Sequence, residues 1–339
     1  MKGEGHLKPV ISGPFQSTLA TSNFFIGFAL SSCAFLIPFK WEFVVYSFLI
    51  SRVVVTCHSL IYHTYFAHRA FKVHNITEFI MGLFATLFGN IGNVGVYSML
   101  HLIHHPYADH EGDPHSPTHG AAHAFFLWRR QKYLGREHDK RLRTDLYKYL
   151  DPRFEGRPGM IFLSRWGLII QVMMYPVAFL FGLMLATYFP QIGLDGPTFL
   201  VYLWAIPMWY GQSQISVLNV FGHSKYWGKK NFDGRDDQSR NSIIMCFLNS
   251  STGWHNNHHQ YPFSAKSGLI GWEVYYDPDY WIIKTMEFLG LAWDVRTPTK
   301  EQIEQDLKFY KEKLEEEEEE EEKNKNISDP APDKEPDVA

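Results

Sequence analysis

Residues 101–105 read HLIHH and residues 255–259 read HNNHH, so the same spacing of three histidines occurs twice in the chain. An α-helix turns about 100° per residue, so the later two histidines of each motif flank the direction of the first, one turn on. Neighbouring histidines point about 100° apart, which suits ligation of two metal ions better than chelation of one. Neutral imidazole is a nitrogen ligand for iron, zinc and copper. The repeated spacing therefore predicts a dinuclear metal centre.

Three further histidines complete the predicted ligand set. His63 and His68 are five residues apart, or about 140° around an α-helix, so we expect them to bracket a helix end that redirects one ring. The pair His58 and His63 has the same spacing but is less favoured, because His58 lies deeper in an apolar segment. Asn219, one turn before His223, is expected to hold a metal-bound water or to act as a weak oxygen ligand. The predicted ligands are His63, His68, His101, His104, His105, His223, His255, His258 and His259, with Asn219.

The remaining histidines and the cysteines are not expected to bind metal. An isolated histidine is more often a satisfied polar residue than a ligand. This applies to His6, His58, His74, His110, His115, His119, His123 and His138. The three cysteines, Cys33, Cys57 and Cys246, are scattered and form no CxxC pair, so they predict neither disulfides nor a thiolate cluster.

Charged residues are segregated along the chain, although the mean hydropathy of -0.21 is typical of a soluble protein. Stretches without Asp, Glu, Lys or Arg exceed the roughly 20 apolar residues that span a bilayer between Lys8 and Lys40, between Arg165 and Asp195, and between Asp195 and Lys225. We predict an all-α integral membrane protein with four transmembrane helices in two hairpins, at residues 22–39, 43–62, 166–188 and 198–220. Arg52, near the middle of the second helix, is expected to face a partner helix or the metal site.

The distribution of basic residues predicts the orientation in the membrane. Lys and Arg are dense in residues 129–143, between the second and third predicted helices, and sparse after the first and third. Because such loops stay in the cytoplasm, both termini and the nine ligand histidines are predicted to be cytoplasmic. A further apolar stretch, residues 79–100, would separate His68 from His101 if it crossed the membrane. It contains the run GNIGNVG at residues 89–95, so we expect a re-entrant or interfacial segment.

Three regions follow from this pattern. Residues 1–21 are predicted to be a cytoplasmic N-terminal segment, and residues 22–298 a membrane domain whose cytoplasmic helical cap holds the histidine-rich dimetal site. Residues 299–339 are predicted to be a charged helix followed by a disordered acidic tail, because the glutamates at residues 315–322 repel one another. Residues 315–339 carry a net charge of -9, which leaves +5 for the remainder, as expected beside anionic lipid headgroups.

Several segments extend the histidine motifs and carry a resemblance to a known family: YHTYFAHRAF at residues 62–71, HLIHHPYADHEGDPHSP at 101–117, NVFGH at 219–223, and GWHNNHHQYPFSAKSGL at 253–269, followed by WEV. From about His58 to Val295 the chain resembles the membrane fatty acyl desaturases. It is most similar to the Δ9-type branch, which includes stearoyl-CoA desaturases and cyanobacterial acyl-lipid desaturases. Arg69 and Phe71 fit the family's pattern after its second histidine, which favours the pair His63 and His68.

The resemblance implies that the nine histidines hold two irons and that Asn219 holds a water on one of them. Zinc is expected as an occupant of recombinant protein that does not support redox chemistry. The chain departs from the family pattern at Leu102, where many members have Arg, at Thr252, where many have Glu, and at residues 59–61, which replace a glycine-rich approach. None of these departures removes a ligand, so they bear on the substrate more than on the chemistry.

The resemblance also implies the reaction, in which O2 and two electrons convert a saturated acyl chain into a cis-unsaturated one, with Δ9 as the expected position. An unactivated methylene is not acidic, so a redox metal is required. The sequence has no dinucleotide, flavin or haem-binding motif and no cysteine cluster, so a separate ferredoxin or cytochrome b5-like protein must supply the electrons. The acyl group can arrive on coenzyme A, on an acyl carrier protein or on a membrane glycerolipid, and no nucleic-acid partner is expected.

Other classes of protein remain as alternatives. A related di-iron site can act as a lipid hydroxylase, which adds sixteen mass units to the product where a desaturase removes two. A metal transporter would favour intramembrane carboxylates and loop-borne histidine repeats, and the sequence has neither. A zinc hydrolase uses three protein ligands and an open position, fewer than the nine histidines predicted here.

The basic segment at residues 129–143 is a candidate docking surface for the electron donor. Neutralising Arg129, Arg130 and Lys132 should slow reduction of the metal centre by the donor, because opposite charges steer encounter. Stopped-flow reduction measures this rate. Unchanged reduction of the folded variant would assign the positive charge to membrane orientation alone.

Overall fold

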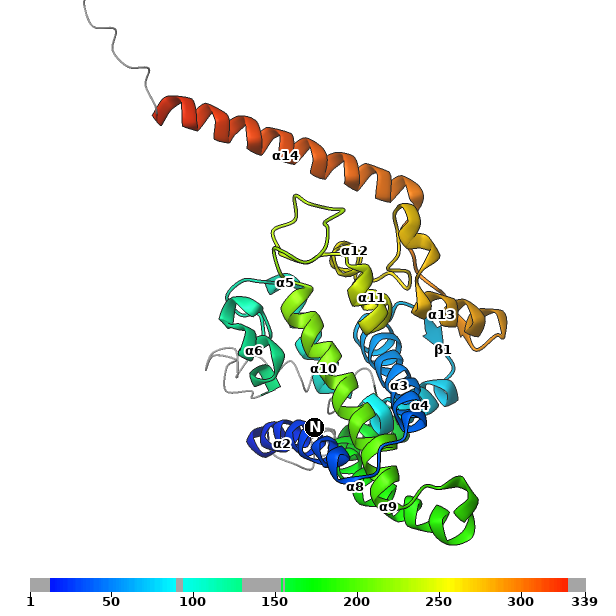
Figure 1. Ribbon diagram of the computed structural model, residues 1–339. Coiled ribbons are helices and arrows are strands. Elements are labelled where there is room, and N and C mark those ends of the chain that lie inside the picture. The colour runs from blue at the N-terminus through cyan, green and yellow to red at the C-terminus, as the bar shows by residue number, and fades with distance from the viewer. Residues whose placement is uncertain (1–12, 90–93, 130–153, 155, 329–339) are drawn as a thin grey trace, which may run out of the picture.

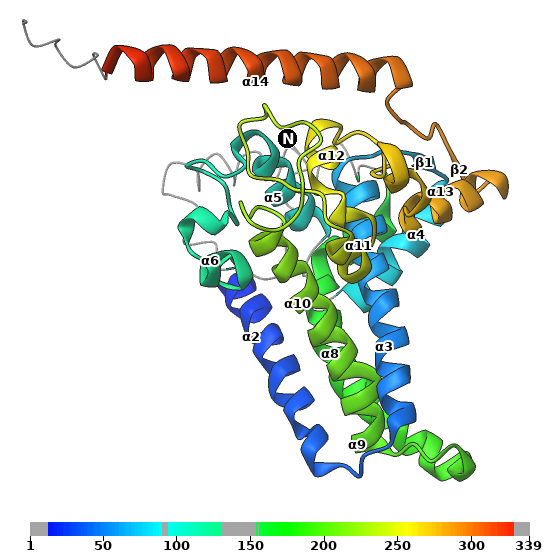
Figure 2. The ribbon, with the colours of Figure 1, turned by 45° about the horizontal axis from the view of Figure 1, so that its top comes forward.

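The computed structural model describes residues 13–89, 94–129, 154 and 156–328. Long helices run side by side through one half of the molecule, and shorter helices and loops form a cap at one end of them (Figures 1 and 2). Three helical segments in the described residues are long and apolar enough to cross a membrane: Leu19–Leu36, Trp41–Ala67 and Pro158–Tyr188. They correspond to the first, second and third predicted spans.

The first two spans each combine two helical types. The first consists of α2 (Gly13–Ser32) and the 3-10 turn η1 (Cys33–Leu36), and the second of α3 (Trp41–Thr56) and the π-helix η2 (Cys57–Ala67). The third is α8 (Pro158–Tyr188). It begins at Pro158 and not at the predicted residue 166, because proline is preorganised for the first position of a helix.

The fourth predicted span lies in a continuous helical segment made of α9 (Gly196–Thr198), the π-helix η8 (Phe199–Ala205) and α10 (Ile206–Phe221). It packs between α2 and α3 (Figure 2). Gln212, Gln214 and Ser216 lower its mean hydropathy, and all of them are buried inside the protein. The segment is therefore less apolar than the other three although its polar side chains do not face outward.

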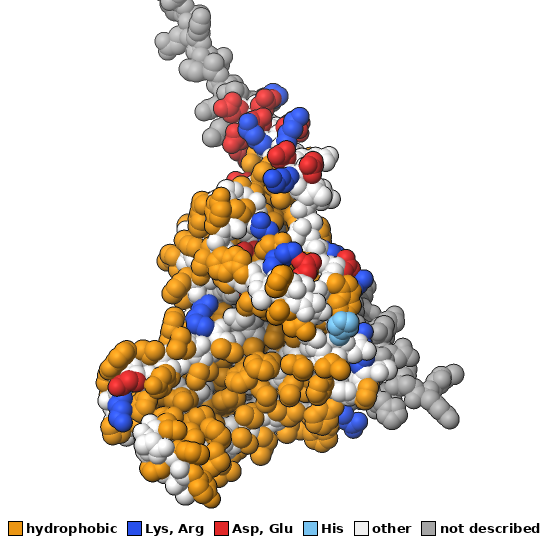
Figure 3. All heavy atoms as spheres, turned by 90° about the vertical axis from the view of Figure 1, so that its right-hand side faces the viewer, with side chains coloured by type: hydrophobic (Ala, Val, Ile, Leu, Met, Phe, Trp, Pro, Cys, Tyr) orange, Lys and Arg blue, Asp and Glu red, His pale blue; other side chains and the backbone are white. Residues whose placement is uncertain are grey.

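Large apolar side chains cover the outer surface of the long helices. A soluble monomer rarely exposes so large a contiguous apolar surface. Figure 3 shows hydrophobic side chains over the lower part of one face, whereas charged side chains gather towards the cap. Exposed examples on α2, α3 and α8 are Phe25, Phe28, Val45, Leu49, Leu180 and Phe181. This surface is the expected contact with lipid.

The described residues of the apolar stretch at 79–100 belong to three helical elements. These are α4 (Asn75–Phe84), the π-helix η3 (Ala85–Gly89) and α5 (Val94–Tyr107), and residues 90–93 lie outside the described residues. Nε2 of His101 lies 2.8 Å from Nε2 of His68. Both ends of the stretch therefore lie on the same side of the molecule, as the sequence predicted.

Arg52 faces a neighbouring helix, as expected for a cation in an apolar segment. Its guanidinium donates a hydrogen bond to the backbone carbonyl of Leu248, 2.8 Å away in α11 (Ile243–Asn249). It also lies over the ring of Phe247, 6.0 Å from the ring centre. The charge is therefore kept on the cap side of α3.

The cap is built from short elements around the ends of the long helices. Two short strands, β1 (Lys72–Val73) and β2 (Ala292–Trp293), pair antiparallel, so the all-α prediction misses one small pairing. The other cap elements are η4 (Pro117–His119), α6 (Ala121–Phe125), η5 (Leu127–Arg129), η9 (Ser250–Gly253), α12 (His255–Gln260), η10 (Gly271–Tyr275) and α13 (Pro278–Phe288). The turn η7 (Pro190–Ile192) lies at the opposite end, between α8 and α9.

The acidic run differs from the prediction of disorder. Helix α14 (Lys300–Ser328) continues through residues 315–322. Glutamate has a high helix propensity, and the lysines one turn away offset part of the repulsion. Lys311 lies 3.5 Å from Glu315, and Lys313 lies 3.5 Å from Glu317. The first half of α14 is also held to the cap, where Tyr261 donates a hydrogen bond of 2.6 Å to Asp306.

Close packing of α10 against α3 gives a test of this arrangement. A Cβ atom at Gly211 would lie 2.4 Å from Cγ1 of Val54. Gly211→Ala should therefore lower the free energy of unfolding by about 1–3 kcal/mol through overpacking, measured by thermal unfolding in detergent. Adding Val54→Ala should recover part of the loss. Equal stability of Gly211→Ala and the parent protein would contradict the packing of α10 on α3.

Candidate metal centre

The nine histidines predicted as ligands come together in the cap, in the part of the chain that the structure describes. They are carried by the end of η2, by α5, by the turn after α10 and by α12. Seven of them are buried, and His68 and His105 are partly exposed. Four segments that are distant in sequence therefore supply one buried site.

One group of rings has its Nε2 atoms around a common centre. His63 Nε2 lies 2.9 Å from His258 Nε2, and His68 Nε2 lies 2.8 Å from His101 Nε2. The Nε2 atom of His105 lies 3.0 Å from that of His101, 3.0 Å from that of His258 and 3.2 Å from that of His68. These five rings form what we call the first cluster.

A second group lies beside it. His223 Nε2 lies 2.8 Å from His255 Nε2, and His104 Nε2 lies 3.3 Å from His259 Nε2. The ligand atoms of these four residues all lie within 4.8 Å of one another, and we call the group the second cluster. His104 and His105 belong to different clusters, as do His258 and His259. Neighbouring rings thus diverge as the helix geometry predicted.

The donor atoms fit metal ions better than they fit one another. A neutral imidazole carries one N–H, so His105 Nε2 cannot form good hydrogen bonds with three Nε2 atoms at once. Ligands about 2.1 Å from a shared ion, at angles between 90° and 109°, lie roughly 3.0–3.4 Å apart. Burial and the neighbouring imidazoles lower the pKa of His101, His105 and His258, so the rings are neutral and offer lone pairs. The geometry fits two transition-metal ions.

Carboxylates orient the rings of the second cluster through their other nitrogen. His104 Nδ1 lies 2.9 Å and 3.0 Å from the oxygens of Asp113, and His223 Nδ1 lies 2.8 Å from Asp109 Oδ2. Such partners fix the tautomer so that Nε2 faces the ion. Burial raises the pKa of both carboxyl groups, but the adjacent histidines lower it more, so both remain ionised. Both carboxylates lie within HLIHHPYADHEGDPHSP, but the spacing of the histidines alone does not reveal their role.

The π-helix explains the spacing of His63 and His68. The backbone N–H of His68 donates to the carbonyl of His63 at 3.2 Å, which closes the i to i+5 turn of a π-helix. Arg69 follows in the left-handed conformation with φ of 51°. The prediction that the pair brackets a helix end is confirmed, whereas the π-helix itself was not expected.

The two asparagines of HNNHH hold α12 in place. The side-chain oxygen of Asn241 accepts hydrogen bonds from the backbone N–H groups of Asn256 and Asn257, at 2.9 Å and 3.2 Å. Asn257 Nδ2 donates to the buried carboxylate of Glu273 at 2.7 Å. Asn256 accepts from the backbone N–H of Asn231 at 2.8 Å. These residues position the three histidines of α12, a role that the spacing of the histidines did not reveal.

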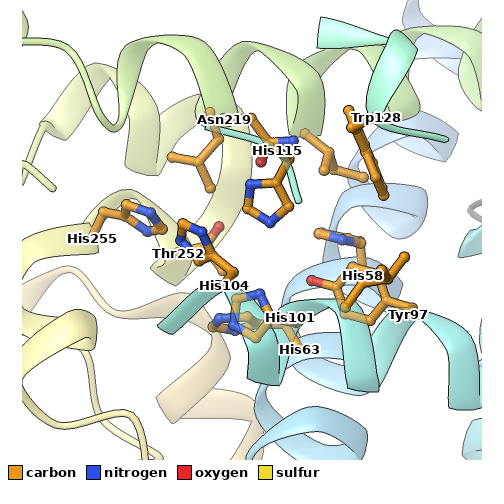
Figure 4. A pocket seen from close by; sticks show the side chains of 13 residues that line it. His58, His63, Tyr97, His101, His104, His115, Trp128, Asn219, Thr252 and His255 are labelled. Carbon is orange, nitrogen blue, oxygen red and sulfur yellow. The ribbon is translucent and has the colours of Figure 1, made fainter. Parts of the chain in front are cut away.

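A small cavity of about 30 Å³ lies against both clusters (Figure 4). It is lined by histidines from each cluster and by apolar side chains that include Tyr97, Leu100 and Leu218. Asn219 and Thr252 also line it, and Asn219 Nδ2 donates to the carbonyl of Ala124 at 3.3 Å. A space of this size has room for an ordered water.

His115 also belongs to this site, although as an isolated histidine it was not expected to bind metal. Its buried ring packs on that of His104, with 4.2 Å between the ring centres, and it lines the cavity. Its backbone N–H donates to Asp113 at 3.0 Å. The signal was its place in the same segment, GDPHSP, fourteen residues after His101.

A buried cage of histidines above long apolar helices defines the histidine-box class of membrane proteins. A model of the fatty acid desaturase family matches residues 39–281. The chain is 31% identical over 235 residues to the sn-2 palmitoyl-lipid 9-desaturase of Nostoc sp. (strain 36), a match that covers 68% of the chain and 73% of the relative.

Two other relatives match a similar share of the chain. The chain is 30% identical over 264 residues to the hex-5-enoyl-(acyl-carrier protein) acetylenase of Moorena producens (strain JHB), covering 71% of the chain and 73% of the relative. It is 29% identical over 248 residues to the acyl-CoA C20 Delta5-desaturase of Anemone leveillei, covering 71% and 70%. The chain belongs to the fatty acid desaturase family, whose enzymes are oxidoreductases that introduce double bonds into fatty acyl chains.

The carboxylate that orients His104 gives a test of the second cluster. Asp113→Asn keeps the size of the side chain but should reduce retention of metal about 10- to 100-fold, since it weakens the control of the ring's tautomer. Metal analysis of the purified protein after dialysis against a chelator measures this. Asp294→Asn, at an exposed position directly after strand β2, is the control and should retain the parent's metal content. Full retention by Asp113→Asn would remove Asp113 from the site.

Proposed function

We propose that this chain is a fatty acyl desaturase that introduces a cis double bond, at the Δ9 position, into a saturated acyl chain. The nine histidines, with a water held by Asn219, are the proposed ligands of two irons. The observation that carries the proposal is that both clusters face one small cavity with apolar walls. The Δ9 position is supported by one of the three relatives described above, which is named a 9-desaturase.

Two irons, when bound, would supply the redox chemistry with O2 that an unactivated methylene requires. The overall reaction takes one O2, two electrons and two protons and yields the alkene and two waters. The protein's contribution is positional. Tyr97, Leu100 and Leu218 form walls that hold one C–C bond against both clusters and exclude water. Asn219 and Thr252 supply polar atoms to the lining of the same cavity.

We propose four membrane crossings, with α9, η8 and α10 together as the fourth, and both termini and the metal site on the cytoplasmic side. The buried polar side chains of α10 support this, because they leave apolar groups for lipid. The proposed regions are a cytoplasmic segment at residues 1–21, a desaturase domain with its cap at residues 22–298, and a charged C-terminal region at residues 299–339.

The proposed electron donor is a separate ferredoxin or cytochrome b5-like protein. Residues 130–143 of the predicted docking loop lie outside the described residues. The acyl carrier is proposed to be coenzyme A, an acyl carrier protein or a glycerolipid, since the three relatives are named for one of each.

Expression of the chain in a desaturase-deficient host tests the proposal. Mass spectrometry should detect acyl chains two mass units lighter, with the new double bond located by fragmentation. Replacing His258 of the first cluster or His104 of the second with Ala should each abolish the product, because each removes a ligand from a different ion. His119→Ala is the matched control, since this exposed histidine lies outside both clusters.

Products sixteen mass units heavier would indicate a hydroxylase, and a triple bond would indicate an acetylenase. Persistent activity in His258→Ala or His104→Ala would refute the ligand assignment.

A further inference from the structure

A second cavity, of about 840 Å³, lies outside the histidine cage. It is lined by residues from the end of η2, from the strand pair and from the positions just before α4 and α8. Four of the lining residues are cationic: Arg69, Lys72, Arg157 and Arg296. Its volume falls in the range of small-molecule sites, about 300–1,000 Å³.

A buried carboxylate fixes two of these cations side by side. Glu78, on α4, has a side chain that is 1% exposed. Its Oε1 pairs with Arg69 at 2.6 Å, and its Oε2 pairs with Arg157. Burial raises the pKa of Glu78, but the two guanidinium groups lower it more, so it remains ionised. Each guanidinium has five N–H donors, and within the described residues the pairing with Glu78 occupies only part of this set.

The other two cations are also held in place. Arg296 donates from Nη2 to the backbone carbonyl of His68 at 2.9 Å, and Lys72 pairs with Asp294 at 2.9 Å. Four cations and two carboxylates leave a net charge of +2 around the cavity. Arginine forks that are preorganised in this way suit the oxygens of a phosphate group.

The cavity lies at the level where the long apolar helices begin and end. Arg69 follows the span Trp41–Ala67 by two residues, and Arg157 directly precedes the span Pro158–Tyr188. Next to it, α4 exposes the apolar side chains of Ile76 and Ile80. On the face shown in Figure 3, apolar side chains meet charged ones along this boundary. Basic pockets at the end of membrane helices bind anionic lipid headgroups.

We propose that this cavity binds the phosphate of an anionic phospholipid headgroup. The proposal rests on the membrane topology proposed above and not on the identity of the metal. It assigns a ligand to four cations that lie outside both histidine clusters. A concave site with fixed guanidinium groups favours this ligand over the broad contact with an acidic protein.

Binding of dihexanoyl phosphatidylglycerol to the purified full chain in an uncharged detergent, followed by native mass spectrometry, tests this. Arg157→Gln should weaken binding about tenfold, since it removes a charge-assisted fork. Lys72→Gln should weaken it about threefold without a folding defect, because within the described residues the only ion pair of Lys72 is with the exposed Asp294. Lys225→Gln removes an exposed cation elsewhere on the cap and should bind like the parent.

Two further ligands show whether the bound phosphate comes from a phospholipid. Inorganic phosphate at the same concentration should bind more weakly than the phospholipid, and an uncharged galactolipid should not compete. Equal binding of the galactolipid would overturn the proposal, and so would unchanged phospholipid binding by both Arg157→Gln and Lys72→Gln. The proposal would also fail if these two variants impaired only the reduction of the protein by an acidic electron donor. His258→Ala should bind the phospholipid normally while losing desaturase activity, so failure of the lipid site and failure of the proposed function are distinguishable.

Discussion

The convergence of histidine Nε2 atoms, about 3 Å apart in a buried space, is the constraint on which the rest of the structure depends. Neutral imidazoles brought so close direct lone pairs at one another, and one N–H per ring cannot satisfy them all. Cations at the two centres would turn this repulsion into ligation. The arrangement of the surrounding helices follows from the need to hold these rings together.

The two clusters differ in the groups that hold their histidine rings in place. The first cluster relies on the π-helix turn at His68 and on α5. The second has carboxylates against three of its rings: Asp113 at His104, Asp109 at His223, and Asp237, whose Oδ2 lies 3.5 Å from Nδ1 of His259. These negative charges favour a cation, and through the bond to Asp109 they raise the pKa of His223 although burial lowers it. The second centre is therefore electrostatically distinct from the first, while both share one cavity.

The spacing of the histidines predicts two groups of converging rings, and the charge-free stretches predict the long apolar helices. Ring direction follows from 100° per residue, so the separation of His104 from His105 could be predicted. The π-helix at residues 57–67 could not, because its register depends on packing. Glu273 acts through contacts with a distant segment, which spacing does not encode. Asp113 and His115 follow His104 in the same segment, but a loop brings them back to its ring, so helical spacing does not mark them. Repulsion among the glutamates at residues 315–322 predicts disorder, but lysines one turn away offset part of it and the segment is helical.

The most direct measurement of the central claim is Mössbauer spectroscopy of the purified chain loaded with 57Fe, with iron and protein quantified in the same sample. The account predicts two irons per chain in two resolved environments of equal population, since among the described residues carboxylates lie against the rings of the second cluster and not against those of the first. A single iron per chain, or iron in a site that does not change when His105 is replaced with Ala, would contradict it.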